Sequence, residues 1–238
     1  MTVTQIIDEI KNISSEKYAA FVRKMIQSET GYGKGDVVLG CKTPDLRKIA
    51  KKYQDAISMD DLLKLLQSQY HEVRILSLII MRHKFQNENL QKNIVKMYLD
   101  NAGFINNWDL VDISARHIVG SYFSHDDDIF EQLSNSPDLW ENRIAVVATH
   151  AFIGQNYFDL TLRLCKKFMT HKHHLIHKAC GWMLREIGKK NENVLADFLR
   201  ENHSHMPRIM LSYAKERLHP QKVEFLRHDL RRYISDVP

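Results

Sequence analysis

Hydrophobic and polar positions along this chain follow the period of amphipathic α-helices. Apolar residues recur at spacings of three and four, and these runs begin behind residues typical of a helix N-terminus. Strict two-residue alternation, which would indicate strands, is absent. The expected helix starts are Ser15, Thr43-Pro44 before residues 45–53, Ser58 with Asp61, Asn87, Asn107, Asp138 with Glu141, Asn191, Pro207 and Pro220. The sequence therefore predicts an all-α protein built from many short helices.

Four of the expected helices share a local pattern in which a cation stands just before an apolar run. These cations are Arg74, Arg143, Lys178 and Arg208. Arg143 and Lys178 are 35 residues apart, and Arg74 and Arg143 are 69 apart, which indicates a helical pair repeated about every 35 residues. We therefore expect a HEAT-like helical-repeat solenoid, an α-α superhelix with a concave binding face. Its cations either line one groove or extend past buried helices to solvent.

Composition places this chain among compact proteins without membrane spans. Gly and Pro together number only 14, and 44% of residues are hydrophobic without an apolar run of membrane length. The three cysteines are odd in number and lack metal-type spacing, which favours a reducing compartment. Residues 1–13 have the pattern of an amphipathic helix, not that of an export signal. We expect one domain over residues 1–238, located in the cytoplasm and, in a bacterium, associated with the nucleoid.

The positive charge is concentrated in the second half of the chain. The net charge is +5, yet residues 160–238 hold 16 Lys and Arg against 8 Asp and Glu, which leaves −3 for the first 159 residues. A basic half favours a polyanionic partner such as DNA or RNA. An ordinary solvated surface is the alternative, since charge alone does not define a binding site.

The common cofactor and metal motifs are absent. Gly31, Gly33 and Gly35 lie between expected helices, with no preceding strand and no following Lys-Ser or Lys-Thr, so a phosphate-binding loop is not expected. His71-Glu72 is not followed by the second histidine of a metalloprotease motif. A histidine cluster has helical spacing but no evident carboxylate or cysteine partner: His171, His173, His174 and His177. We expect neither a metal nor an organic cofactor.

Two expected helix faces combine indole rings with charges. Trp108 and Asp112 are four residues apart, and Lys178, Trp182 and Arg185 follow at i, i+4 and i+7. Two such faces are able to share one groove.

The alternative for these faces is structural. Both tryptophans would then belong to the core, Asp109 would cap a helix start, and Asp112 would pair with Arg116 one turn later.

Four segments together resemble the DNA alkylation repair enzymes, the AlkD-like DNA glycosylases, over most of the chain. They are Gly40-Cys41-Lys42-Thr43-Pro44-Asp45-Leu46-Arg47, Trp108-Asp109-Leu110-Val111-Asp112, Trp140-Glu141-Asn142-Arg143 and Gly181-Trp182-Met183-Leu184-Arg185-Glu186. The resemblance implies a HEAT-like solenoid that holds duplex DNA in its concave face. It also implies hydrolysis of the N-glycosidic bond of N3- or N7-alkylated purines.

The resemblance also implies roles for individual residues. Asp112 would be the catalytic carboxylate, and Trp108 and Trp182 would be the aromatic walls against the deoxyribose of the lesion. Such a site would stabilise the oxocarbenium character of the sugar through the carboxylate and the indole faces.

The predicted DNA contacts come from two arguments. By resemblance, Arg143 would bind a backbone phosphate, and Lys42 and Thr43 would approach the opposite strand. Lys178 belongs to the repeated cationic pattern and Arg185 shares its helical face, so both are expected to bind phosphates in the same groove.

The sequence thus predicts a monofunctional DNA glycosylase that acts without a base-reading pocket. Its expected partner is double-stranded DNA containing alkylated purines, with no membrane and no obligate protein partner. Two alternatives are a non-catalytic relative that binds DNA structures and a helical-repeat scaffold for another protein.

Overall fold

The computed structural model describes residues 2–27, 32–33, 35–219 and 221. Within these residues the regular elements are α-helices and two 3-10 helices, and extended pairing is limited to an isolated parallel bridge between Val37 and Tyr70. The prediction of an all-α protein is confirmed. Over the same residues, we found no helix with both the length and the apolar character required to cross a bilayer.

The chain divides into two compact units, Met1–Tyr122 and Phe123–Pro238. The first contains α1 (Val3–Asn12), α2 (Glu16–Ile26), α3 (Thr43–Tyr53), α4 (Met59–Leu66), α5 (His71–Lys84), α6 (Glu88–Asp100), η1 (Ala102–Phe104) and α7 (Trp108–Tyr122). The second contains α8 (Ile129–Asn135), α9 (Leu139–Ala148), α10 (His150–Gly154), α11 (Asp159–Lys167), η2 (Phe168–Thr170), α12 (His174–Lys190), α13 (Glu192–Asn202) and α14 (Arg208–Lys215). The single domain expected over residues 1–238 stays a prediction.

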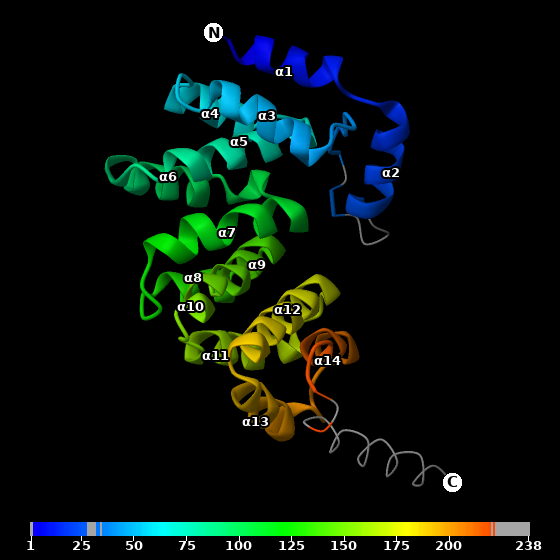
Figure 1. The fold of residues 1–238 in the computed structure, drawn as a ribbon, viewed down its shortest axis with the longest axis vertical. Helices are drawn as coiled ribbons and strands as arrows, with labels where there is room; N and C mark the ends of the chain where they lie inside the picture. Colours follow the sequence, from blue (N-terminus) through cyan, green and yellow to red (C-terminus); the bar gives the residue numbers. More distant parts are fainter. Residues whose placement is uncertain (1, 28–31, 34, 220, 222–238) are drawn as a thin grey trace. The chain divides into compact units, whose positions relative to one another are not determined.

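Helix α5 is the centre of the first unit. It packs against α3 and α4 on one side and against α7 on the other, and Figure 1 shows these helices in successive layers. Its residues are buried almost continuously from His71 to Met81. A helix that is buried on most faces requires apolar side chains around its circumference, with each buried polar group paired. The buried polar groups of α5 are therefore central to the site described below.

Helix α12 has the same place in the second unit. It packs against α9, α11, α13 and α14. A Cβ atom at Gly181 would lie 2.6 Å from both the carbonyl oxygen of Met210 and the Cβ of Tyr213. The absence of a side chain at Gly181 thus allows α14 to contact the α12 backbone closely.

Most of the expected helix starts are confirmed. Capping side chains accept backbone N–H groups at Ser58, Asn87, Asp138 and Asn191. The helix expected from Thr43-Pro44 runs over Thr43–Tyr53. Pro207 occupies the N-cap position of α14, one residue before the expected first turn. Pro220 lies outside the described residues.

Candidate active site and nucleic-acid interface

The first turn of α7 carries Trp108 and is anchored by the residue before it. The Asn107 side chain is fully buried, accepts the backbone N–H of Trp108 at 2.9 Å and donates to the carbonyl of Ile26 at 3.0 Å. The half-buried indole of Trp108 packs against Ala19, Ile26 and Val38. Helix α2 and the segment that follows it therefore support one side of this indole.

Asp112 lies one turn further along α7 and is half-buried. Its negative charge acts on Tyr98, a fully buried residue whose hydroxyl lies 2.9 Å from the Ser114 hydroxyl. Burial raises the pKa of Tyr98, the Ser114 hydrogen bond lowers it, and the charge of Asp112 raises it further. The Asp112 carboxylate thus lies close enough to the buried Tyr98 hydroxyl for its charge to act there.

A buried charge network holds the same turn of α7. The His71 Nε2 atom lies 2.8 Å from an Asp109 carboxylate oxygen, and its Nδ1 atom lies 3.4 Å from Asp36. Asp36 also forms an ion pair with Arg74 and accepts from Asn106 at 3.3 Å. His71, Arg74 and Asp36 are buried and Asp109 is partly exposed, so the two carboxylates compensate cations that have little access to water.

The protonated form of His71 is the favoured one in this network. Burial lowers its pKa, but the hydrogen bond to Asp109 and the neighbouring Asp36 carboxylate outweigh burial and raise the pKa to about 9. For the Asp36 carboxyl, burial acts in the opposite direction and would raise the pKa. Its contacts with His71, Arg74 and Asn106 outweigh burial and hold this pKa below the usual value. In the sequence, His71 appears only as part of an incomplete metal motif. No local spacing indicates a network that joins positions 36 and 109.

The loop before α3 is fixed by the buried carboxylate of Glu72. This carboxylate accepts the backbone N–H groups of Leu39 at 2.9 Å, Gly40 at 2.6 Å and Cys41 at 3.4 Å. Gly40 has φ of +86°, and a Cβ there would lie 2.1 Å from the carbonyl oxygen of Ser15. The loop therefore contacts the start of α2 through a position that only glycine fits.

The two predicted opposite-strand residues follow this loop. Lys42 is exposed at the N-cap of α3, and Thr43 is its half-buried first residue. The Lys42 ammonium lies 5.8 Å from the centroid of the Tyr18 ring, a cation–π distance.

In the second unit, α12 positions Trp182 through the carboxylate of Glu186. The indole Nε1 of Trp182 donates to Glu186 Oε1 at 3.1 Å. Lys189 donates to the two carboxylate oxygens at 2.6 and 2.8 Å, and His150 lies 3.9 Å from one of them. The His150 and Trp182 rings are 5.9 Å apart. The role of Glu186 in orienting Trp182 was not predicted, although the i, i+4 spacing of the two residues is visible in the sequence.

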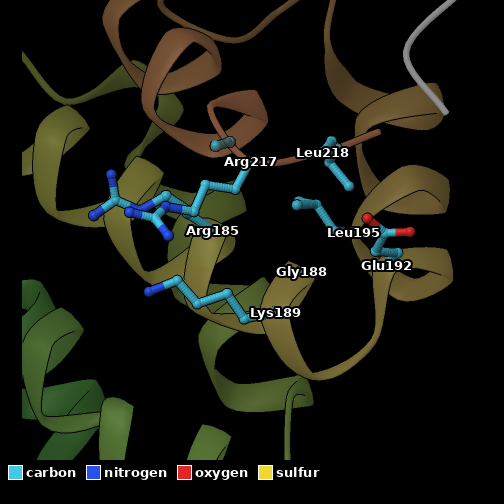
Figure 2. A pocket seen from close by; sticks show the side chains of 8 residues that line it. Arg185, Gly188, Lys189, Glu192, Leu195, Arg217 and Leu218 are labelled. Carbon is cyan, nitrogen blue, oxygen red and sulfur yellow. The ribbon is translucent and has the colours of Figure 1, made fainter. Parts of the chain in front are cut away.

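Arg185 points from α12 toward α14. It forms an ion pair with Glu216 and lines a cavity of about 210 Å³ in the second unit. Figure 2 shows the side chains of Arg185, Lys189 and Arg217 extending to the same side of this cavity, with Glu192 on the opposite side. The charge of Arg185 is therefore compensated by a carboxylate of the chain itself.

The four cations of the repeated pattern occupy different environments. Arg74 and Arg143 have exposed fractions of 3% and 4%, whereas Lys178 is half-buried and Arg208 is exposed. Arg143 Nη1 donates to the carbonyl oxygen of Leu175 at 2.7 Å, which joins α9 to α12. Arg74 and Arg143 thus hold protein groups in the interior. The phosphate contact expected of Arg143 stays a prediction.

The histidine cluster before and within α12 makes capping contacts. His171 Nδ1 accepts the backbone N–H of His173 at 3.0 Å, and His173 Nδ1 accepts that of Leu175 at 3.2 Å. Burial is the first cause that lowers the pKa of each histidine in the cluster. Among the described residues, no three His, Cys, Asp or Glu side chains are arranged to hold a metal ion.

The predicted site residues divide between the two units. Lys42, Thr43, Trp108 and Asp112 belong to the first unit, with Trp108 and Asp112 on α7. Arg143, Lys178, Trp182 and Arg185 belong to the second unit, the last three on α12.

The fold is all-helical, and comparison with known proteins identifies the class to which it belongs. The family model described as DNA alkylation repair enzyme matches residues 6–218, so the chain belongs to that family. This membership confirms the resemblance and supports a role in DNA alkylation repair.

Solved structures are similar to the chain in fold. One is a predicted DNA alkylation repair enzyme from Enterococcus faecalis, with TM-score 0.67 and 17% identity over 86% of this chain and 96% of that chain. Another represents a new family of proteins related to the HEAT-like repeat DNA glycosylases with affinity for branched DNA structures. Its TM-score is 0.62, with 15% identity over 84% of this chain and 83% of that chain. The HEAT-like fold prediction is confirmed. The comparison with curated proteins gave no match.

Proposed function

We propose that this protein is a monofunctional DNA glycosylase that hydrolyses the N-glycosidic bond of N3- and N7-alkylated purines in duplex DNA. Its family membership supports the repair role. The observation that carries the proposal is the pairing of Trp108 and Asp112 on the anchored first turns of α7. A rigidly supported indole and a carboxylate on one helical face are suited to a positively charged transition state.

The proposed reaction breaks the bond between the sugar C1′ atom and the purine nitrogen. The bonding electrons leave with the alkylated purine, which was cationic and becomes neutral, so no acid is needed to protonate it. The sugar acquires oxocarbenium character, which Asp112 stabilises as an anion. Water then adds to C1′, and its proton is released to Asp112 or to solvent.

DNA would be held mainly through phosphates and sugars. Trp108 and Trp182 would contact the deoxyribose, Lys178 and Arg185 would bind phosphates, and Lys42 would approach the opposite strand. Phosphate contacts position DNA without reading its sequence. This mode suits an enzyme whose selectivity comes from the lesion.

The test is base release from a duplex that contains one 7-methylguanine, in buffer with a metal chelator. We expect release by the wild-type chain and a fall of about a hundredfold or more for Asp112→Asn, because one preorganised electrostatic group is removed. DNA affinity should stay within about twofold. Asp100→Asn, an exposed α6 carboxylate paired with Lys96, is the matched control and should excise at the wild-type rate. Excision by Asp112→Asn at that rate would contradict the assignment.

A second candidate is a binding protein without chemistry. The structural neighbour with affinity for branched DNA structures favours it, since its fold is similar. That function predicts tight binding of branched DNA and no base release by the wild-type chain. Binding of neither damaged nor branched DNA would favour a protein scaffold instead.

A further inference from the structure

Helix α2 presents an aromatic surface that its packing in the first unit does not use. Its inner side is buried through Ala19 and Ile26. On the outer side Phe21 has an exposed fraction of 56% and Met25 of 48%. A large aromatic side chain with more than half of its surface in water does not contribute its apolar area to the fold, so a binding role accounts for it better.

Phe21 belongs to an aromatic pair next to a wide, open cavity. The Tyr18 and Phe21 rings are stacked at an angle of 28° with centroids 6.0 Å apart. They line a cavity of about 710 Å³ together with Lys17 and Lys42. A volume of this size accommodates a nucleobase and part of its backbone.

The charges around this cavity favour an anionic chain. Its two acidic neighbours are compensated, because Glu16 pairs with Arg23 and Asp45 pairs with Lys48. Among the described residues, neither of the two lysines that line the cavity has an ion-pair partner. Cations without carboxylate partners beside stacked aromatic rings are the combination that binds nucleic-acid strands with unstacked bases.

Hydrogen bonds within the fold fix the wall of the cavity that faces α2. Gly40 lines it and accepts the backbone N–H of Ser15 at 3.1 Å, while Glu72 fixes the same loop from the interior. This arrangement places Lys42, two residues after Gly40, over the Tyr18 ring. The cation and the aromatic platform thus keep a fixed relation, as a preorganised binding site requires.

We propose that the outer face of α2 is a subsite for an unpaired nucleobase of bound DNA. The base stacks on the Tyr18 and Phe21 rings, and Lys17 and Lys42 bind the flanking phosphates. This inference rests on the DNA binding of the proposed function and extends it, because it gives the protein a preference for DNA in which a base has left the helix. The subsite lies on α2 and is separate from the Trp108 and Asp112 side chains of α7.

The experiment uses the full chain and two DNA duplexes of equal length. One carries a single bulged 2-aminopurine, and the other carries 2-aminopurine fully paired. We expect tighter binding of the bulged duplex by the wild type, with quenching of the fluorescent base when it stacks. Phe21→Leu keeps apolar volume but removes the aromatic face, so it should bind the bulged duplex about tenfold more weakly, which is about 1.4 kcal/mol. Affinity for the paired duplex should change less than twofold.

Matched variants separate this subsite from general effects. Phe104→Leu removes another exposed aromatic of the first unit and should retain wild-type selectivity. Lys42→Gln should weaken the binding of both duplexes and reduce the salt dependence of these affinities. Equal affinity of Phe21→Leu and wild type for the bulged duplex overturns the proposal. Equal weakening on both duplexes, or dissociation of an oligomer by Phe21→Leu in sedimentation, also overturns it.

The outcome is separable from that of the proposed glycosylase activity. If 7-methylguanine is released but bulge selectivity does not depend on Phe21, the subsite is wrong and the glycosylase proposal stands. If bulge selectivity depends on Phe21 without any base release, the glycosylase proposal is wrong and the subsite stands.

Discussion

The imidazole of His71 and the carboxylate of Asp109 are joined at 2.8 Å, and this contact ties the first residue of α5 to the first turn of α7. Asp36, Arg74 and Asn106 complete the groups around His71 and its partners. Asp109 follows Trp108 directly, so the network fixes the turn that carries the proposed aromatic wall. Its charge state should therefore control both stability and the orientation of this turn.

We expect the stability of the chain to fall between about pH 6.5 and pH 9 because of His71. The pKa of His71 is raised from 6.5 to about 9 in the folded state. The folded protein therefore keeps a proton that the unfolded chain loses at a lower pH. The resulting stabilisation is complete below about pH 6.5 and is lost as the pH rises through 9, with an amplitude of about 3 kcal/mol.

Chemical denaturation at pH 6.5 and pH 9 measures this effect. His71→Gln has no titratable ring and should show a smaller fall across the interval than the wild type. His83→Gln removes a more exposed histidine of the same helix, paired with Asp55, and should keep the wild-type fall. Identical pH dependence of wild type and His71→Gln would show that the network does not titrate there.

A glycine series tests how α2 and the loop before α3 pack together. Gly40→Ala combines a left-handed φ of +86° with a clash against the Ser15 carbonyl, so it should lower the unfolding free energy by about 3 kcal/mol or more. Gly35→Ala has φ of +93° with nothing within 4 Å, so only the backbone strain of about 1–2 kcal/mol applies. Gly103→Ala has neither feature and should be neutral. Thermal unfolding of the three variants should follow this order, and equal effects of Gly40→Ala and Gly35→Ala would argue against the close packing.

Glu186 should act as a positioning residue for Trp182. Glu186→Ala leaves the indole N–H without its acceptor and is expected to slow excision of 7-methylguanine about tenfold in single-turnover assays. Glu186→Gln retains a carbonyl oxygen for the hydrogen bond and should restore most of the rate. Glu192→Ala, an exposed change at the start of α13, is the control. Equal losses for Ala and Gln would indicate that the charge of Glu186, not its hydrogen bond, matters.

Alanine substitutions of Arg143 and Lys178 are expected to affect different properties, stability and DNA affinity respectively, although both residues belong to the repeated cationic pattern. Arg143→Ala removes the donor to the Leu175 carbonyl and should lower the melting temperature by several degrees. Lys178→Ala should leave the melting temperature unchanged and reduce the slope of log affinity against log salt by about one unit. A change in salt slope for Arg143→Ala at unchanged stability would instead support its phosphate contact.

The helical fold was predictable because its signals are local. Capping residues such as Ser58 and Asp138 lie within three residues of the groups they bind, and the apolar period extends over single helices. The same pattern could not separate buried from exposed cations. Arg74 and Arg208 both precede apolar runs, yet Arg74 is buried and forms an ion pair with Asp36 from another segment, whereas Arg208 is exposed.

The candidate site was predictable only in its helical parts. The i, i+4 relation of Trp108 and Asp112 was visible along α7 and corresponds to one helix in the structure. The supports of this turn come from α2, from Asp36 and from His71, which are distant in sequence and carry no shared spacing. Phe21 and Tyr18 did provide a signal, an aromatic pair three residues apart beside lysines, but exposure decides its meaning and only the structure gives exposure.

The substrate range follows from the chemistry that the proposed residues can supply. The singled-out side chains comprise two indoles, one carboxylate and several cations, which suit sugar and phosphates better than the hydrogen-bonding edge of a base. A cationic N3- or N7-alkylated purine is already an activated leaving group, whereas uracil, hypoxanthine and 8-oxoguanine are neutral and would need acid assistance worth about a hundredfold to ten-thousandfold in rate. We therefore expect release of 7-methylguanine, 3-methyladenine and purines with bulky N7 substituents, since no pocket has to close around the base. Single-turnover assays on matched duplexes measure these rates. Comparable rates on a neutral lesion would mean that the enzyme supplies a proton to the leaving base, and the proposed mechanism would be wrong.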